Sequence, residues 1–185
     1  YASHGDTKHI ILIPSNPTEC FEFSVMAFDL ADRLQTPVIV LSDLDIGMND
    51  FTTKEFSWRD KYTFDRGKVL TKEDLDNMES FGRYLDVDGD GIPYRTYPGT
   101  HSEKGAFFTR GSSHDEYAVY TEDGKVNARN LTRILKKHKT ASRLVPKPVI
   151  NSENSSTGVW YQKQHGHTAK YSAVVCYSMA ESQPG

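Results

Sequence analysis

Two short, almost entirely apolar runs on either side of a helix-like stretch restrict the fold of this chain more than any other pattern. The runs are 9–14 (HIILIP) and 38–41 (VIVL), and helical spacing extends between them over about 17–35. Continuous apolar runs of this length are typical of strands that are covered on both faces, as in a parallel sheet. The expected unit is therefore a strand, a crossover helix and a second, parallel strand. The fold class that follows is α/β with a parallel sheet.

The ends of the expected helix carry residues with known capping preferences. Asn16 can cap the amino end, Pro17 suits the first helical position, and Glu19 can close a capping box. The helix is expected to end near Gln35, because Thr36-Pro37 breaks it. Its apolar residues have the three-and-four spacing of a face that packs on a sheet: Phe21, Val25 and Phe28, with Phe23, Ala27, Leu30 and Leu34 flanking them.

The turn after the first strand and the tip of the second strand bear on ligand binding. The turn, 14–17 (PSNP), contains two prolines and no glycine, which excludes a dinucleotide-binding fingerprint. Ser42 and Asp43 follow the second strand, at the edge where open α/β sheets bind ligands. These residues line a site or cap the next turn, and capping is the favoured interpretation.

The segment 86–92 (DVDGDGI) matches the opening of a calcium loop. In such a loop the alternate carboxylates of Asp86, Asp88 and Asp90 converge on the ion. The twelfth loop position, where glutamate is expected, holds Tyr97, and neither flank is a convincing EF-hand helix. A tight turn built from aspartate and glycine is therefore preferred, and no metal site is assigned.

A second polar cluster, 111–117 (GSSHDEY), places an imidazole, two carboxylates and two hydroxyls together after a glycine. The serines lack the Gly-x-Ser-x-Gly pattern of a nucleophile elbow, so a hydrolase triad has little support. His165 and His167 alternate without acidic or cysteine partners at metal-ligand spacing, and we interpret them as incidental.

Four other segments have recognisable local patterns. Residues 49–76 are polar with scattered aromatic residues, as expected of an excursion that covers a site or contacts another subunit. Within it, 71–75 is expected to be a capped helix, and the following 81–85 could form a strand. Residues 125–139 predict a basic amphipathic helix, whose charges fit a solvated face or an acidic partner better than nucleic acid. Its apolar side is expected to hold Val126, Leu131, Ile134 and Leu135.

Charge and cysteine content limit the classes of partner. The 22 basic and 25 acidic residues leave a formal charge of -3, which offers no global attraction for nucleic acid or an anionic membrane. No apolar run approaches the roughly 20 residues that span a bilayer. Cys20 and Cys176 lie far apart and lack metal-ligand spacing, so a cytoplasmic location is expected. The chain does not begin with methionine, and we expect it to start partway through a longer polypeptide.

Three segments, followed by the basic helix, resemble the alpha subunit of 2-oxoacid:ferredoxin oxidoreductases, nearest the 2-oxoglutarate type. They are 14–47 (PSNPTECFEFSVMAFDLADRLQTPVIVLSDLDIG), 88–100 (DGDGIPYRTYPGT) and 107–123 (FFTRGSSHDEYAVYTED). The resemblance covers about 5–148, in the same order and spacing. It implies that residues 1–148 are the C-terminal part of a thiamine diphosphate-binding domain of the pyrimidine type, incomplete at its N-terminus.

This resemblance implies oxidative decarboxylation of a 2-oxoacid, nearest 2-oxoglutarate, to an acyl-coenzyme A, with electrons passing to ferredoxin. Thiamine diphosphate with Mg²⁺ would be shared with a beta subunit, and that partner subunit would also hold an iron-sulfur cluster. The family's catalytic glutamate and its Tyr-Pro-Ile-Thr-Pro motif have no match here, so the catalytic residues are expected upstream. Arg95, His114 and Asp115 are expected on the substrate side, where Arg95 or His114 would bind a dicarboxylate. A salt-bridged loop that only supports the domain is the alternative.

The end of the chain departs from the family pattern. Residues 149–185 are expected to be a linker and an aberrant or truncated start of a second α/β domain, because 151–185 contains no leucine or isoleucine. The stretch 157–161 resembles the opening of a strand, and a shifted reading frame or a truncated gene would explain the change after Tyr161. The chain alone is expected to be inactive. The alternative function is a noncatalytic calcium-binding or assembly module that uses the loop 86–91.

Overall fold

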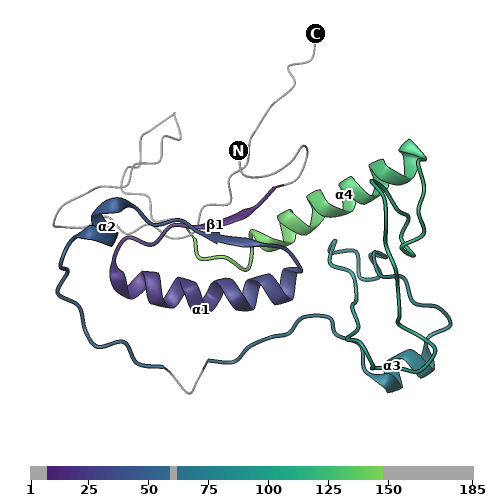
Figure 1. The fold of residues 1–185 in the computed structure, drawn as a ribbon, viewed down its shortest axis with the longest axis horizontal. Helices are drawn as coiled ribbons and strands as arrows, with labels where there is room; N and C mark the ends of the chain where they lie inside the picture. Colours follow the sequence, from purple (N-terminus) through teal and green to yellow (C-terminus); the bar gives the residue numbers. More distant parts are fainter. Residues whose placement is uncertain (1–7, 59–61, 148–185) are drawn as a thin grey trace, which may run out of the picture.

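The structure is a computed structural model that describes residues 8–58 and 62–147. Its elements are β1 (Ile10–Leu12), α1 (Pro17–Leu34), β2 (Val38–Val40), α2 (Leu44–Met48), α3 (Lys72–Asn77) and α4 (Gly124–Ala141). Helix α1 runs along the two strands, and α4 extends from them toward the part of the chain that holds α3 (Figure 1). No helix in these two ranges is long and apolar enough to cross a membrane. Several sequence-based expectations lie outside the described residues: the segment 149–185 with its strand at 157–161, His165, His167 and Cys176.

The two strands pair in parallel, which confirms the expected strand, helix and parallel strand. Ile10 pairs with Val38 and Leu12 with Val40. Ile10 and Leu12 are fully buried, at 0% exposure. The second apolar run is less covered than expected, since the residues of β2 are half-buried and Leu41 is 52% exposed. Full burial of this run is therefore wrong within the described residues, where β1 and α1 are the elements packed against β2.

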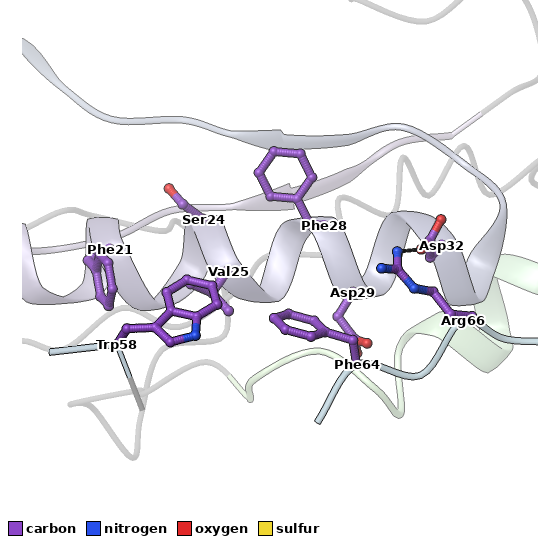
Figure 2. Close-up of a pocket in the computed structure, with 9 residues that line it drawn as sticks. All are labelled: Phe21, Ser24, Val25, Phe28, Asp29, Asp32, Trp58, Phe64 and Arg66. Atoms are coloured by element: carbon purple, nitrogen blue, oxygen red, sulfur yellow. Dashed lines mark hydrogen bonds and ion pairs between the residues drawn. The ribbon is translucent and has the colours of Figure 1, made fainter. Parts of the chain in front are cut away.

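Helix α1 has apolar residues on two sides, and spacing alone selects the wrong one for the sheet. The buried residues on the sheet side are Phe23, Leu30 and Leu34. On the other side are Phe21 and Val25, which lie beside Trp58 and Phe64 of the excursion, and Phe28, whose ring points away from these two (Figure 2). Both sets satisfy a spacing of three and four, so the distinction is made by tertiary packing.

Exposure of Phe28 gives a direct test of this corrected orientation. Its ring is 79% exposed, so Phe28→Ser is expected to change the free energy of unfolding by less than about 0.5 kcal/mol. Urea denaturation followed by circular dichroism measures the change. A loss above about 2 kcal/mol would instead place Phe28 in the core, as the sequence-based assignment had it.

The amino end of α1 is capped as predicted, with one change. The Asn16 side chain accepts a hydrogen bond from the Glu19 backbone N–H at 2.9 Å. The Glu19 carboxylate does not return to Asn16 but accepts from the backbone N–H and the hydroxyl of Ser15, at 2.9 and 2.8 Å. The return bond of the capping box is therefore made to Ser15, one residue before the N-cap Asn16. Glu19 also lies where a helix amino end favours negative charge.

The carboxyl end of α1 is held by residues that lie far along the chain. Gln35 caps the helix in a left-handed conformation with φ of 50°, which is uncommon for a residue other than glycine. Its side-chain amide donates to the Pro93 carbonyl at 2.6 Å. Its own backbone carbonyl accepts from Lys137 Nζ of α4 at 3.2 Å. A buried lysine thus supplies positive charge at the negative end of the helix dipole.

The segment 71–85 confirms one expectation and overturns another. The capped helix expected over 71–75 is confirmed as α3, and its cap is a full capping box between Thr71 and Asp74. Residues 81–85 are not a strand but a turn, closed by a bond from Leu85 N to the Gly82 carbonyl at 3.2 Å. Apolar and aromatic side chains favoured a strand there, but the glycine permits a reversal that brings the chain against Glu116, whose carbonyl accepts from Tyr84 N at 2.9 Å.

Helix α4 forms as predicted, but its buried side is polar. The buried residues are Asn130, Lys137, His138 and Ala141, whereas Leu135, expected on the apolar side, is 45% exposed. Burial lowers the pKa of the His138 imidazole, with the charges of Lys137 and other nearby cations adding to the effect. Hydropathy predicts the wrong buried face for α4. Cationic side chains that contact backbone carbonyls and aromatic rings are buried here in preference to leucine.

Candidate functional site

The aromatic ring of Tyr84 joins the sequence-predicted histidine to two arginines. His114 stacks on this ring with 3.9 Å between ring centroids and 27° between planes. The guanidinium carbons of Arg83 and Arg133 lie 5.3 and 5.9 Å from the same centroid, within the range of cation–π attraction. We call these four residues the Tyr84 cluster. It assembles the turn 81–85, the loop around His114 and helix α4.

The loop that carries His114 is shaped by its own carboxylate. Asp115 Oδ1 accepts hydrogen bonds from the backbone N–H groups of Tyr117 and Val119, both at 2.9 Å. The loop is joined to α4 by the Asn130 side chain, which donates to the His114 carbonyl at 2.6 Å. Asp115 therefore builds a turn, and the imidazole of His114 is presented to Tyr84.

Arg95 approaches the same region from the side of α1. Its guanidinium lies 3.3 Å from Asp32 and donates to the Arg66 carbonyl at 2.7 Å. Its positive charge also contributes to a lowered pKa of Arg83. Of the three predicted residues, His114 and Asp115 share one loop at Tyr84. Arg95 is paired with Asp32 instead, and its link to the cluster is the effect of its charge on the pKa of Arg83.

Burial sets the electrostatics of the cluster. Desolvation lowers the pKa of the Arg83 guanidinium and that of Arg133, and the charge of Arg83 adds to the effect at Arg133. One turn further along α4, desolvation and the charges of Arg133 and Arg83 lower the pKa of Lys137 to about 8. Three like charges are thus gathered in a region that water reaches poorly.

The acidic loop 86–91 is neutralised by lysines of this chain. Lys68 Nζ lies 2.6 Å from Asp88 and 2.8 Å from Asp90, and Lys136 pairs with Asp86 at 3.2 Å. Asp86 also accepts from Gly91 N at 3.0 Å, which closes the turn. An ammonium group thus lies between two carboxylates of the calcium-like pattern, and these contacts fit the tight-turn interpretation. Among the described residues, no set of three histidine, cysteine or acidic side chains has the geometry of a metal site.

The strand tips at the carboxyl edge of the sheet form caps. Asp43 Oδ1 accepts from Ile46 N at 2.8 Å and caps α2, which confirms the favoured interpretation. Burial raises the pKa of the nearby Cys20 thiol, and a hydrogen bond with Ser42 opposes this shift. The thiol is thus held in its protonated, less nucleophilic form.

The outer side of α1 borders an apolar groove of about 500 Å³ (Figure 2). Aromatic side chains of α1 and the excursion form most of its wall, and an ion pair closes one end. The groove is lined by Phe21, Ser24, Val25, Phe28, Asp29, Asp32, Trp58, Phe64 and Arg66. The excursion does pack on the domain, as expected.

Sequence reasoning missed Tyr84 and the two arginines. Arg83 and Tyr84 fell in the expected strand, and Arg133 was counted among the charges of a solvated helix face. A signal is present only in hindsight: Arg133 and Lys137 are four residues apart and on the same side of α4 as buried Asn130.

Comparison with known families gives a match over nearly half of the chain. Residues 1–88 match a family model described as pyruvate flavodoxin/ferredoxin oxidoreductase, thiamine diphosphate-binding. The match includes the parallel strand pair, α1 and the turn that carries Tyr84, and it ends before the His114 loop.

Similar proteins extend the comparison to the rest of the chain. Subunit alpha of 2-oxoacid:ferredoxin oxidoreductase 1 from Sulfurisphaera tokodaii is 28% identical over 148 residues, 79% of this chain and 22% of that protein. Subunit alpha of enzyme 2 from Aeropyrum pernix is 28% identical over 161 residues, 85% of this chain and 24% of that protein. Subunit KorA of 2-oxoglutarate synthase from Methanothermobacter marburgensis is 51% identical over 47 residues, 25% of this chain and 12% of that protein. The chain thus spans less than a quarter of the length of these relatives.

Proposed function

We propose that the chain is part of the alpha subunit of a 2-oxoacid:ferredoxin oxidoreductase, because residues 1–88 match the family model described as pyruvate flavodoxin/ferredoxin oxidoreductase, thiamine diphosphate-binding. The reaction is oxidative decarboxylation of a 2-oxoacid to an acyl-coenzyme A, with electrons passing to ferredoxin. The family match is the observation that carries this proposal. The 51% identity to a 2-oxoglutarate synthase subunit, although over only 47 residues, favours 2-oxoglutarate as the substrate.

In this proposal a beta subunit shares thiamine diphosphate and Mg²⁺ with the chain and holds the iron-sulfur cluster. The cofactor, when bound, supplies the nucleophilic carbon for decarboxylation, and the protein supplies orientation and electrostatics. Two carboxylates at the carboxyl edge of the sheet do not fit the role of activating its aminopyrimidine ring. Glu19 is bonded to Ser15 and Asp43 caps α2, so both are engaged in local structure.

The described residues support a role in binding the substrate rather than in the chemical step. His114 is held against Tyr84 and Arg95 against Asp32, so neither side chain needs ordering when a ligand arrives. Either can offer charge or a hydrogen bond to a dicarboxylate. Asp115 acts as a positioning residue, because it fixes the turn that presents His114.

The test is coexpression of the complete alpha-subunit gene with the gene for the proposed beta subunit. The purified complex is expected to reduce a viologen dye in a reaction that requires both 2-oxoglutarate and coenzyme A. Absence of this activity with any 2-oxoacid would contradict the proposed function.

Within that assay, His114→Gln is expected to raise the KM for 2-oxoglutarate about tenfold, as loss of one charge-assisted hydrogen bond would. The matched control is His101→Gln, since His101 pairs with Asp76 of α3, away from the Tyr84 cluster. An active complex in which His114→Gln and His101→Gln behave alike would remove the role of His114 and leave the oxidoreductase assignment intact.

A further inference from the structure

Arg83 is a desolvated cation without a polar partner in the described part of the chain. Its guanidinium rests on the rings of Tyr84 and Phe107, at 5.3 and 5.5 Å from their centroids. Nη1 is buried, and no described residue accepts a hydrogen bond from it. A guanidinium has five N–H donors, and leaving buried donors unpaired is costly.

Arg133 faces the same ring and is also incompletely paired. One amino group donates to the Gly91 carbonyl at 3.2 Å, while Nε is buried and has no partner among the described residues. Both arginines lie within 6 Å of the Tyr84 centroid, at 5.3 and 5.9 Å. The two guanidinium groups are thus gathered around one aromatic ring.

Positive charge at this position exceeds what the described residues neutralise. Lys137 lies one turn from Arg133 on α4 and is 7% exposed, with its ammonium bonded to a backbone carbonyl rather than a carboxylate. The nearby acids are already engaged, since Asp86 pairs with Lys136 and Glu116 with Arg129. Buried charges are stable when they are paired.

We propose that Arg83 and Arg133 form a binding site for a small dianionic group, a phosphate or a dicarboxylate, beside the Tyr84 ring. Two planar guanidinium groups match the oxygens of such a group with paired, charge-assisted hydrogen bonds. Lys137 strengthens the positive potential one turn away. The site adds two residues to the neighbourhood of His114 and stands independently of the proposed oxidoreductase activity.

The test is calorimetric titration of the full chain with pyrophosphate and, separately, with glutarate, at ionic strength fixed with sodium chloride. One of these anions is expected to bind at one site per chain, and the two arms identify phosphate or carboxylate as the preferred group. Arg83→Gln and Arg133→Gln are each expected to weaken binding at least about tenfold. Lys139→Gln is the matched control, because this exposed lysine is on α4 and its loss changes the net charge equally.

Binding of neither anion beyond chloride would overturn the proposal, as would equal binding by the wild-type chain and both arginine variants. An equal loss in Lys139→Gln would also overturn it, because it would indicate a general charge effect. If the variants fail to fold, modification of the wild-type chain with phenylglyoxal provides the second measurement. Mapping by mass spectrometry is expected to show slower reaction at Arg83 and Arg133 when the anion is present, and an unchanged rate would reject the site.

Discussion

Replacing Gly91 with alanine is expected to destabilise the protein by about 2–5 kcal/mol. Gly91 has φ of 84°, a conformation that costs other residues roughly 1–2 kcal/mol. An added Cβ would also overlap the backbone nitrogen of Lys137 and lie 2.6 Å from the carbonyl oxygen of Arg133. These are backbone atoms of α4 that cannot rotate away, so overpacking adds a further cost of about 1–3 kcal/mol or more.

Gly99→Ala is the matched control for this variant. Gly99 has nearly the same φ, 85°, but nothing lies within 4 Å of its added Cβ, so only the conformational cost of about 1–2 kcal/mol is expected. Urea denaturation of the two variants separates steric overlap from backbone strain. Similar losses in both would show that the turn does not pack closely on α4.

The second large effect is a pH dependence that originates at Lys137. Burial and the charges of Arg133 and Arg83 lower the pKa of this lysine from 10.5 to about 8. The unfolded chain therefore binds more protons than the folded chain between these two values. Stability contributed by Lys137 rises with pH through this window and is lowest below pH 8. The difference between about pH 7 and pH 10.5 is about 3 kcal/mol.

Lys137→Met isolates this contribution, because other groups also titrate in the alkaline range. The free energy of unfolding of the wild-type chain, minus that of Lys137→Met, is expected to increase by about 3 kcal/mol from about pH 7 to pH 10.5. Lys139→Met serves as the reference for an exposed lysine on the same helix and is expected to follow the wild-type profile. A difference that stays flat, or falls with pH, would show that Lys137 remains charged at little cost.

The parts of the fold that sequence predicts are those set by local interactions. The caps of α1 and α3 depend on side chains within a few residues of the helix ends, so the cap residues Asn16 and Thr71 can be recognised in the sequence. The parallel strand pair follows because two apolar runs joined by a helix have few ways to bury themselves. The family resemblance read from 14–47 agrees with the match over residues 1–88.

The parts that sequence does not predict depend on partners far along the chain. Phe23 is 6% exposed and Phe28 is 79% exposed, because the sheet covers one side of α1 and not the other. The calcium-like aspartates are paired by Lys68, about twenty residues earlier in the chain, which no local pattern reveals. The contacts of Tyr84 form only in the folded chain, where the turn 81–85, the loop around His114 and helix α4 come together.

For the site, the sequence predicted the loop that carries His114 and, separately, Arg95. It did not predict the residues that surround them in the structure. The polar cluster 111–117 pointed to His114 and Asp115, whereas Arg95 followed from the family resemblance, and the role of all three toward a substrate remains our proposal. Arg83 and Arg133 escaped because arginine is common on exposed helix faces and turns. Only their desolvation, which is a property of the packed structure, sets them apart.

The anchoring of Gln35 has a consequence for how the chain is made. Its contacts, Pro93 and Lys137, lie 58 and 102 residues further along. At ribosomal rates of about 5–20 residues per second, α1 emerges roughly 5–20 s before its last anchor has been synthesised. During that interval we expect the amino cap of the nascent helix to form before its other end is anchored, so translation speed sets how long this state persists.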